Sequence, residues 1–177
     1  MLEVHMAQAV GVQVSPRAQI MIIEEKIEVK AMCLFVYEGR VLVASGKTFQ
    51  GKKGGRKIVP GDFYRVLGGS MNFRETSEQA VRREIQEELQ SEINNLEFLN
   101  VAENIFIYAG EKRHEIVFLF SGQLARKDLY HKEIIHIVED SYEGDAIWVP
   151  IGDILNGEIP LYPSTNYKNV FEKIKII

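Results

Sequence analysis

The stretch GGSMNFRETSEQAVRREIQEEL, residues 68–89, places a glycine pair, a polar loop and a helical segment in succession. Thr76 is a good N-cap, and Gln79 three residues later completes a capping box, so a helix is predicted to begin at Thr76. Apolar residues recur every four positions along it and predict one buried stripe. These residues are Val81, Ile85 and Leu89.

The same helix carries three glutamates, Glu84, Glu87 and Glu88, beside that stripe. At about 100° per residue their carboxylates project within about one quadrant. Like charges four residues apart destabilise a helix by roughly 0.2–0.5 kcal/mol per pair. Two explanations are open: a solvated acidic face, or a site for a hard divalent cation, since Mg²⁺ prefers oxygen ligands and often shares them with substrate phosphates.

The flanking residues favour the metal site. The pattern is a glycine, five residues, a glutamate, seven residues, Arg-Glu, an apolar residue, any residue and Glu-Glu. Average residue usage gives a chance match somewhere in such a chain a probability on the order of 10⁻⁴. The pattern resembles the Nudix box, here residues 69–91, and the likeness extends less specifically over residues 27–177. Its members here are Gly69, Glu75, Arg83, Glu84, Ile85, Glu87 and Glu88.

This resemblance implies a Nudix fold of the α/β (α+β) class, with a mixed β-sheet sandwiched between helices, in a domain of residues 27–177. It also implies a hydrolase that cleaves the pyrophosphate bond of a nucleoside diphosphate linked to another moiety, with ADP-ribose or a nucleotide sugar favoured. Glu75 would pair with Arg83 and hold the loop against the helix. Mg²⁺ or Mn²⁺ would be bound by Glu84, Glu87 and Glu88, with the Gly69 carbonyl as a further ligand.

Two adjacent positions depart from the family pattern. The motif continues with a glycine and an apolar residue where this chain has Gln90 and Ser91. Glycine there would take the left-handed conformation that ends a helix. Its absence predicts that the helix continues through residues 90–93 and stops near Asn94 and Asn95.

Catalysis by the resembling enzymes implies in-line attack by water, with a carboxylate as the general base. The candidates are Glu88, Glu139, Asp140 and Glu143, of which we favour Glu143. Arg65 is expected either to contact a phosphate or to form a structural ion pair. Glu115 is expected either to face the metal or to be an exposed charge at a strand end.

Other functions are compatible with the same pattern. A Nudix-like module could sense a nucleotide without cleaving it, although the loss of metal carboxylates that would mark such a module is not seen. The fold could also support an isomerase or other metal-dependent chemistry, because fold does not fix function. A purely structural acidic helix is disfavoured by the matches at Gly69, Glu75 and Arg83.

Composition bounds the remaining choices. The chain has 177 residues, 46% hydrophobic and 26% charged, as expected for one globular domain. A net charge of −4 gives no long-range attraction for nucleic acid. The longest apolar run, residues 31–37, is far shorter than a membrane span, and neither a signal peptide nor a second cysteine beside Cys33 is present. We therefore expect a cytoplasmic protein that acts on a small molecule and contacts no membrane.

The rest of the chain is predicted as follows. Residues 1–26 form an extension, for which native and part vector-derived origins are both open. Its alternating segment could add a strand across a homodimer. Residues 27–37 and the strand after Gly39 form a hairpin. Residues 47–57 form a cationic loop, either solvated or in contact with a substrate phosphate. Two long antiparallel strands follow the helix, and a C-terminal helix begins at Ser164 or Thr165.

Overall fold

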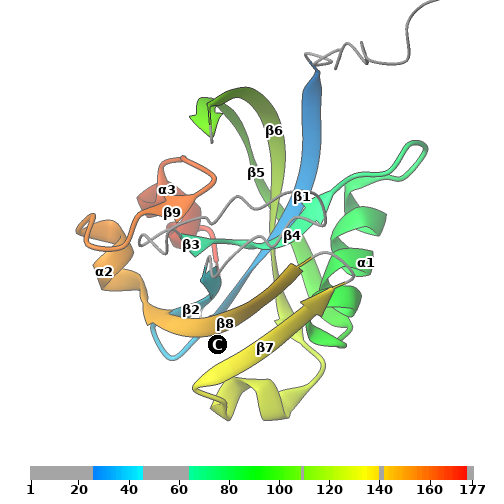
Figure 1. The fold of residues 1–177 in the computed structure, drawn as a ribbon. Coiled ribbons are helices and arrows are strands. Elements are labelled where there is room, and N and C mark those ends of the chain that lie inside the picture. The colour runs from blue at the N-terminus through cyan, green and yellow to red at the C-terminus, as the bar shows by residue number, and fades with distance from the viewer. Residues whose placement is uncertain (1–25, 46–63, 109, 140–141, 175–177) are drawn as a thin grey trace, which may run out of the picture.

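The structure is a computed structural model that describes residues 26–45, 64–108, 110–139 and 142–174. They form a mixed nine-stranded sheet with helices on its two sides (Figure 1), which confirms the predicted α+β architecture. The principal strand order is β5-β6-β1-β2-β3-β9, with β4 paired to β1 and β7 paired to β8. The N-terminal extension and the cationic loop of residues 47–57 lie outside the described residues.

The hairpin at the start of the domain is confirmed. β1 (Ile27–Tyr37) and β2 (Arg40–Ser45) pair antiparallel through a two-residue turn. Both turn residues, Glu38 and Gly39, have positive φ, at 49° and 70°, as a type I′ hairpin turn requires. Beyond this hairpin β1 pairs antiparallel with β4 and parallel with β6 (Glu111–Leu124). β1 therefore lies at the centre of the sheet and connects its parts.

The two long strands after the first helix are also confirmed. β5 (Ile93–Tyr108) pairs antiparallel with β6 from Ile93↔Leu124 to Tyr108↔Glu111, with irregularities between Asn94 and Asn100. β5 ends at Tyr108 and β6 begins at Glu111, and these two residues face each other in the register. Among the described residues β5 is an edge strand of this sheet.

Shorter elements complete the fold. β4 (Leu67–Ser70) lies beside the first helix, and β3 (Tyr64–Arg65) pairs with β9 (Leu161–Tyr162). β7 (Ile134–Glu139), β8 (Tyr142–Pro150) and α2 (Ile151–Leu155) follow one another along the chain. α3 (Tyr167–Glu172) is capped by Asn166, whose side chain accepts the Asn169 N–H. The predicted caps at Ser164 and Thr165 are therefore wrong.

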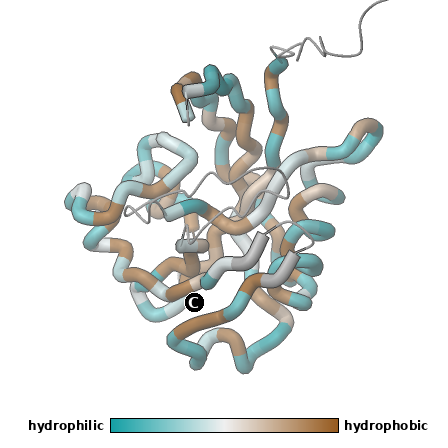
Figure 2. Tube along the Cα trace, viewed as in Figure 1, coloured by the Kyte–Doolittle hydropathy of each residue, from teal (hydrophilic) through white to brown (hydrophobic). Residues whose placement is uncertain are grey.

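Alternating residues of β1 build two hydrophobic cores, one on each face of the sheet. Ala31, Cys33 and Phe35 pack on the side of α1 (Ser77–Leu89), and Met32 and Leu34 pack on the side of α2 and α3. Figure 2 shows hydrophobic segments along the central strands and hydrophilic ones at the turns. The predicted α1 stripe is buried, and full burial of such side chains contributes about 1.5–3 kcal/mol each. Its residues, Val81, Ile85 and Leu89, are at most 2% exposed.

The end of α1 differs from the prediction. Thr76 and Gln79 form the expected capping box at its start. The helix stops at Leu89, however, because Gln90 itself takes the left-handed conformation, with φ 52° and ψ 40°, and donates its N–H to the Gln86 carbonyl. A non-glycine residue therefore adopts the helix-ending geometry that glycine normally supplies, and the chain enters β5 at Ile93.

Within the described residues, helices as long and apolar as a membrane crossing would need do not occur.

Candidate active site

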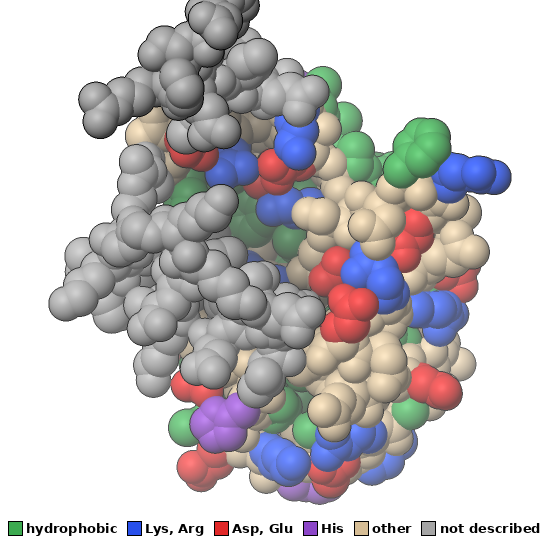
Figure 3. All heavy atoms as spheres, turned by 45° about the vertical axis from the view of Figure 1, so that its right-hand side comes forward, with side chains coloured by type: hydrophobic (Ala, Val, Ile, Leu, Met, Phe, Trp, Pro, Cys, Tyr) green, Lys and Arg blue, Asp and Glu red, His purple; other side chains and the backbone are tan. Residues whose placement is uncertain are grey.

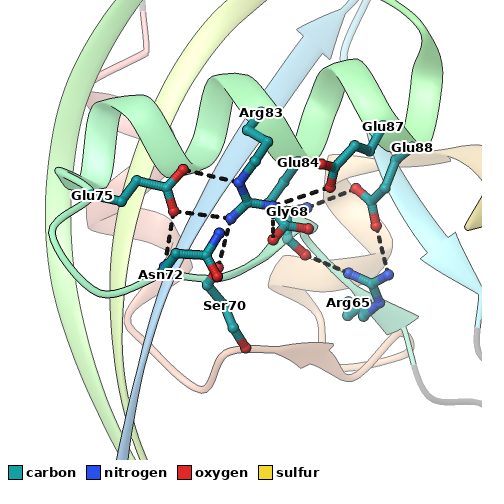
Figure 4. A network of polar contacts seen from close by, with 9 residues as sticks. All are labelled: Arg65, Gly68, Ser70, Asn72, Glu75, Arg83, Glu84, Glu87 and Glu88. Atoms are coloured by element: carbon teal, nitrogen blue, oxygen red, sulfur yellow. Dashed lines mark hydrogen bonds and ion pairs between the residues drawn. The ribbon is translucent and has the colours of Figure 1, made fainter. Parts of the chain in front are cut away.

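Arg83 is the centre of a polar network between α1 and the loop before it (Figure 4). Its guanidinium contacts both oxygens of Glu75, with Nε at 2.9 Å from Oε1 and one terminal nitrogen at 3.0 Å from Oε2. The other terminal nitrogen lies 2.8 Å from Glu84 Oε1 and 3.0 Å from Glu87 Oε2. Arg83 also donates to the Ser70 carbonyl at 2.9 Å. One cation thus offsets the repulsion among three carboxylates.

This network shifts the pKa of both partners in the bidentate pair. Hydrogen bonds from Arg83, and then from the Asn72 backbone N–H, lower the pKa of Glu75. The Glu75 carboxylate is the main cause that raises the pKa of Arg83. Both groups are therefore charged at neutral pH, and they tie the loop at Asn72 to the helix.

Glu88 is held by a second arginine. Its side chain is 1% exposed, and Oε1 lies 2.6 Å from Arg65 of β3. Its Oε2 accepts the Gly68 N–H at 2.9 Å, while Arg65 also donates to the Gly68 carbonyl at 2.8 Å. Of the two expectations for Arg65, the structure therefore contains the ion pair. A phosphate contact stays a prediction.

Glu84 lies against the backbone of Gly69. A Cβ added at Gly69 would come 2.3 Å from Glu84 Oε2, so only glycine leaves room for this carboxylate. Glu84 and Glu88 are 9% and 3% exposed, whereas the Glu87 side chain is 48% exposed. A solvated acidic face would expose all three. The burial of Glu84 and Glu88 therefore counts against a solvated acidic face, because buried carboxylates need partners.

These carboxylates open into a cavity of about 450 Å³. Glu84, Glu88 and the glycine pair line it together with Lys30, Glu115 and Tyr162 from β1, β6 and β9. On the face shown in Figure 3, acidic and cationic side chains gather beside a hollow with hydrophobic side chains in it.

Glu115 is buried, at 4% exposure, and is not the exposed strand-end charge that was one of the two expectations. It forms an ion pair with Lys30 at 2.9 Å and accepts a hydrogen bond from the Tyr162 hydroxyl. Burial, followed by the Glu115 carboxylate, raises the pKa of Tyr162 well above its usual range. Sequence reasoning missed Lys30 and Tyr162, because the pairing of β3 with β9 that brings Tyr162 here leaves no local signal.

The other sequence candidates are placed less fully. Glu143 and Glu139 lie on β8 and β7, where the backbone is described and the side chains are not, and Asp140 lies outside the described residues. His114 and His136 contact Glu103 and Asp145, and neither histidine is among the residues that line this cavity.

The donor set suits a hard divalent cation, since it consists of carboxylate oxygens beside a close-packed glycine backbone. As they stand, the described residues include no group of three acidic, histidine or cysteine side chains arranged to hold a metal ion. The reason is visible in the contacts: Arg83 and Arg65 already bind these carboxylates. The oxygen atoms of these residues are therefore suitable ligands for a divalent metal. For the three carboxylates to bind one ion together, their ion pairs with Arg83 and Arg65 must rearrange.

Comparison with known proteins gives a consistent result. The NUDIX domain model matches residues 27–168. Comparison with curated proteins finds no match. Among solved structures, the MutT NUDIX hydrolase from Burkholderia pseudomallei is 24% identical, with a TM-score of 0.50 over 85% of this chain and 100% of that chain.

Two further solved structures share the fold. A NUDIX hydrolase from Nitrosomonas europaea is 16% identical, with a TM-score of 0.53 over 83% of this chain and 88% of that chain. The mutator MutT protein from Bacillus halodurans is 19% identical, with a TM-score of 0.50 over 83% of this chain and 80% of that chain. At these identities the likeness concerns the fold alone.

Proposed function

The chain belongs to the Nudix family of pyrophosphohydrolases, and we propose that it cleaves the pyrophosphate bond of a nucleoside diphosphate linked to another moiety, such as ADP-ribose or a nucleotide sugar. The observation that carries the proposal is the placement of two buried carboxylates, Glu84 and Glu88, on one cavity beside a glycine pair.

Glu84, Glu87 and Glu88, with the Gly69 carbonyl, would hold Mg²⁺ or Mn²⁺. The bound metal would neutralise diphosphate oxygens and lower the pKa of the attacking water. Arg83 and Glu75 hold the loop against α1, so the glycine backbone and the carboxylates keep a fixed relation. In this assignment Arg83 and Glu75 are positioning residues.

We favour Glu143 as the general base over Glu88. The Glu88 carboxylate already accepts the Arg65 guanidinium at one oxygen and the Gly68 N–H at the other, so both oxygens have donors other than an attacking water. Glu139 and Asp140 remain alternatives in the same segment. Glu143→Gln should remove the fall in rate at low pH that protonation of the general base causes. An unchanged pH-rate profile would exclude Glu143 as the base.

The size of the cavity supports a substrate with a group beyond the diphosphate. About 450 Å³ falls within the range of roughly 300–1,000 Å³ usual for small-molecule sites. Part of its wall is aromatic, with Phe106, Tyr108 and Tyr162. The lining therefore offers apolar contact as well as charge.

A panel of ADP-ribose, nucleotide sugars, dinucleoside polyphosphates, NADH and oxidised nucleoside triphosphates tests this function. Product release would be measured with Mg²⁺, with Mn²⁺ and with EDTA. We expect turnover of at least one diphosphate-linked compound and none in EDTA. If no compound turns over and a nucleotide still binds, the protein is a nucleotide sensor instead.

We also propose a homodimer. Support comes from β5, whose side chains Ile105 and Ile107 are 74% and 73% exposed, since exposed apolar clusters often mark interfaces. Sedimentation of the wild type and of Ile105→Glu tests it: a monomeric wild type would contradict the proposal.

A further inference from the structure

We propose that the part of this cavity formed by Lys30, Glu115, Phe106 and Tyr162 binds the nucleobase of the substrate. The proposal rests on the proposed function, because it assigns the base to one part of the cavity and the diphosphate to the carboxylates of α1.

The two parts of the cavity lie on different strands. Glu84 and Glu88 reach it beside the glycine pair of β4, while Glu115 lies on β6 and Phe106 on β5. In the strand order from β4 through β1 and β6 to β5, Lys30 lies one strand spacing from β4, Glu115 two and Phe106 three, so the far end of this part is about 14 Å from β4. A nucleoside diphosphate likewise has two different ends, with the phosphates at one end and the base at the other.

Glu115 is buried in the wall of the cavity, at 4% exposure. Its Oε2 contacts both the Lys30 ammonium and the Tyr162 hydroxyl. An ionised carboxylate has two oxygens that can accept several hydrogen bonds in total, so an N–H group of a base can add a further donor to this side chain.

Lys30 provides the complementary group. Its ammonium carries three donors, and its contacts within the described residues are the Glu115 carboxylate and the face of the Tyr162 ring, at 5.8 Å from the centroid. A carboxylate and an ammonium side by side therefore present one acceptor and spare donors. The Watson–Crick edge of every nucleobase likewise carries both donors and acceptors.

Aromatic rings complete the site. The Phe106 and Tyr162 rings have centroids 5.8 Å apart at an angle of 60°, and both line the cavity. Base stacking on such rings tolerates any base. Asn104, the cross-strand neighbour of Glu115, accepts the Ser164 N–H at 2.8 Å and so holds the segment after Tyr162 against β5.

A purely structural ion pair is the competing explanation for Lys30 and Glu115. It accounts for their contact but not for their position in the wall of a cavity beside two aromatic rings. It also makes a different prediction, because a structural pair would affect stability and leave the preference among ligands unchanged.

The test compares ribose 5-phosphate with AMP, GMP, CMP and UMP in calorimetric titrations with Mg²⁺. These compounds contain no pyrophosphate bond, so binding is measured without turnover. We expect the best nucleotide to bind at least about 10-fold more tightly than ribose 5-phosphate. Lys30→Met/Glu115→Leu removes both charges together and leaves neither buried alone. It should reduce this preference to less than about 3-fold.

Phe106→Leu provides a second variant that leaves the ion pair intact, and it should also lower the preference. The matched control is Glu103→Gln/His114→Gln, an ion pair of 2.8 Å on the same two strands outside the cavity lining, which should keep the wild-type preference.

A wild type without preference for nucleotides would overturn the inference. So would a folded Phe106→Leu and a folded double variant that both retain the preference. Turnover of the substrate panel is measured separately, so hydrolysis with an unchanged preference would leave the proposed function standing and refute only the base site.

Discussion

Arg65 and Glu88 lie 2.6 Å apart across the junction of β3 and α1, with the Glu88 side chain 1% exposed. Both residues also bond to Gly68, one to its carbonyl and one to its N–H. The strand, the glycine and the helix are therefore joined through one buried ion pair. This contact connects the stability of the fold with the position of a proposed metal ligand.

Arg65→Gln should lower the free energy of unfolding by roughly 3 kcal/mol, because it leaves a buried carboxylate without its cation. Arg65→Gln/Glu88→Gln should lose less than the sum of the two single variants, since both charges are then absent. Urea unfolding in EDTA measures these values. Arg40→Gln is the control, because its pair with Glu38 is exposed and should contribute less than about 1 kcal/mol. Additive losses would show that Arg65 and Glu88 are not coupled.

Glu87→Gln should reduce kcat by roughly 10²-fold or more, because a metal ligand is lost. Its stability should stay within about 0.5 kcal/mol of wild type, since the side chain is 48% exposed. Mn²⁺ binding, followed by electron paramagnetic resonance, should weaken in parallel. Glu78→Gln breaks the equivalent i,i+4 pair with Arg82 on the same helix and should retain activity. Near-normal rates for Glu87→Gln would refute its assignment as a ligand.

The two glycines of β4 should respond differently to alanine. At Gly68, with φ 123°, a Cβ would lie 2.4 Å from the Ala31 backbone oxygen. Gly68→Ala should therefore cost at least about 2 kcal/mol of stability. At Gly69 the clash is with the Glu84 side chain, so Gly69→Ala should mainly reduce Mn²⁺ affinity and activity. Thermal melts and Mn²⁺ titrations separate the two effects. Equal losses of stability would contradict this distinction.

Glu75 should contribute to stability in a pH-dependent way. Its pKa is lowered in the folded protein, first by the Arg83 hydrogen bonds and then by the Asn72 N–H. The contribution is therefore present above the unfolded carboxyl pKa, about 4.3, and is lost as pH falls through the lower folded pKa. The difference in unfolding free energy between wild type and Glu75→Gln should shrink as pH drops from about 5 to below that folded pKa. A difference independent of pH would exclude this linkage.

Local signals in the sequence were sufficient to predict the helix and the hairpin that carry the site. The capping box of Thr76 and Gln79 and the period of the α1 stripe involve residues within one or two helical turns. The turn at Glu38 and Gly39 likewise defines a hairpin by itself. Each of these predictions depends on contacts close in the chain, and each is confirmed.

Contacts between distant segments explain what the sequence did not predict. Ser164, Thr165 and Asn166 are all good helix caps, yet the Ser164 N–H is bound by Asn104 and the Thr165 hydroxyl accepts a hydrogen bond from Asn100. Only Asn166 caps α3. Lys30 and Tyr162 meet Glu115 for the same reason, through strand pairings that no local pattern specifies.

The end of α1 gives a final prediction, at Gln90, one of the two positions where the chain departs from the family motif. Gln90 has φ 52°, a conformation that costs a non-glycine residue roughly 1 kcal/mol. Gln90→Gly should remove this cost and raise the free energy of unfolding by about 0.5–1 kcal/mol. Gln86→Gly, inside the helix, should instead lower the free energy of unfolding by about 1 kcal/mol. Chemical denaturation measures both. A loss of stability in Gln90→Gly would mean that contacts of the glutamine side chain, and not its backbone conformation, decide where the helix ends.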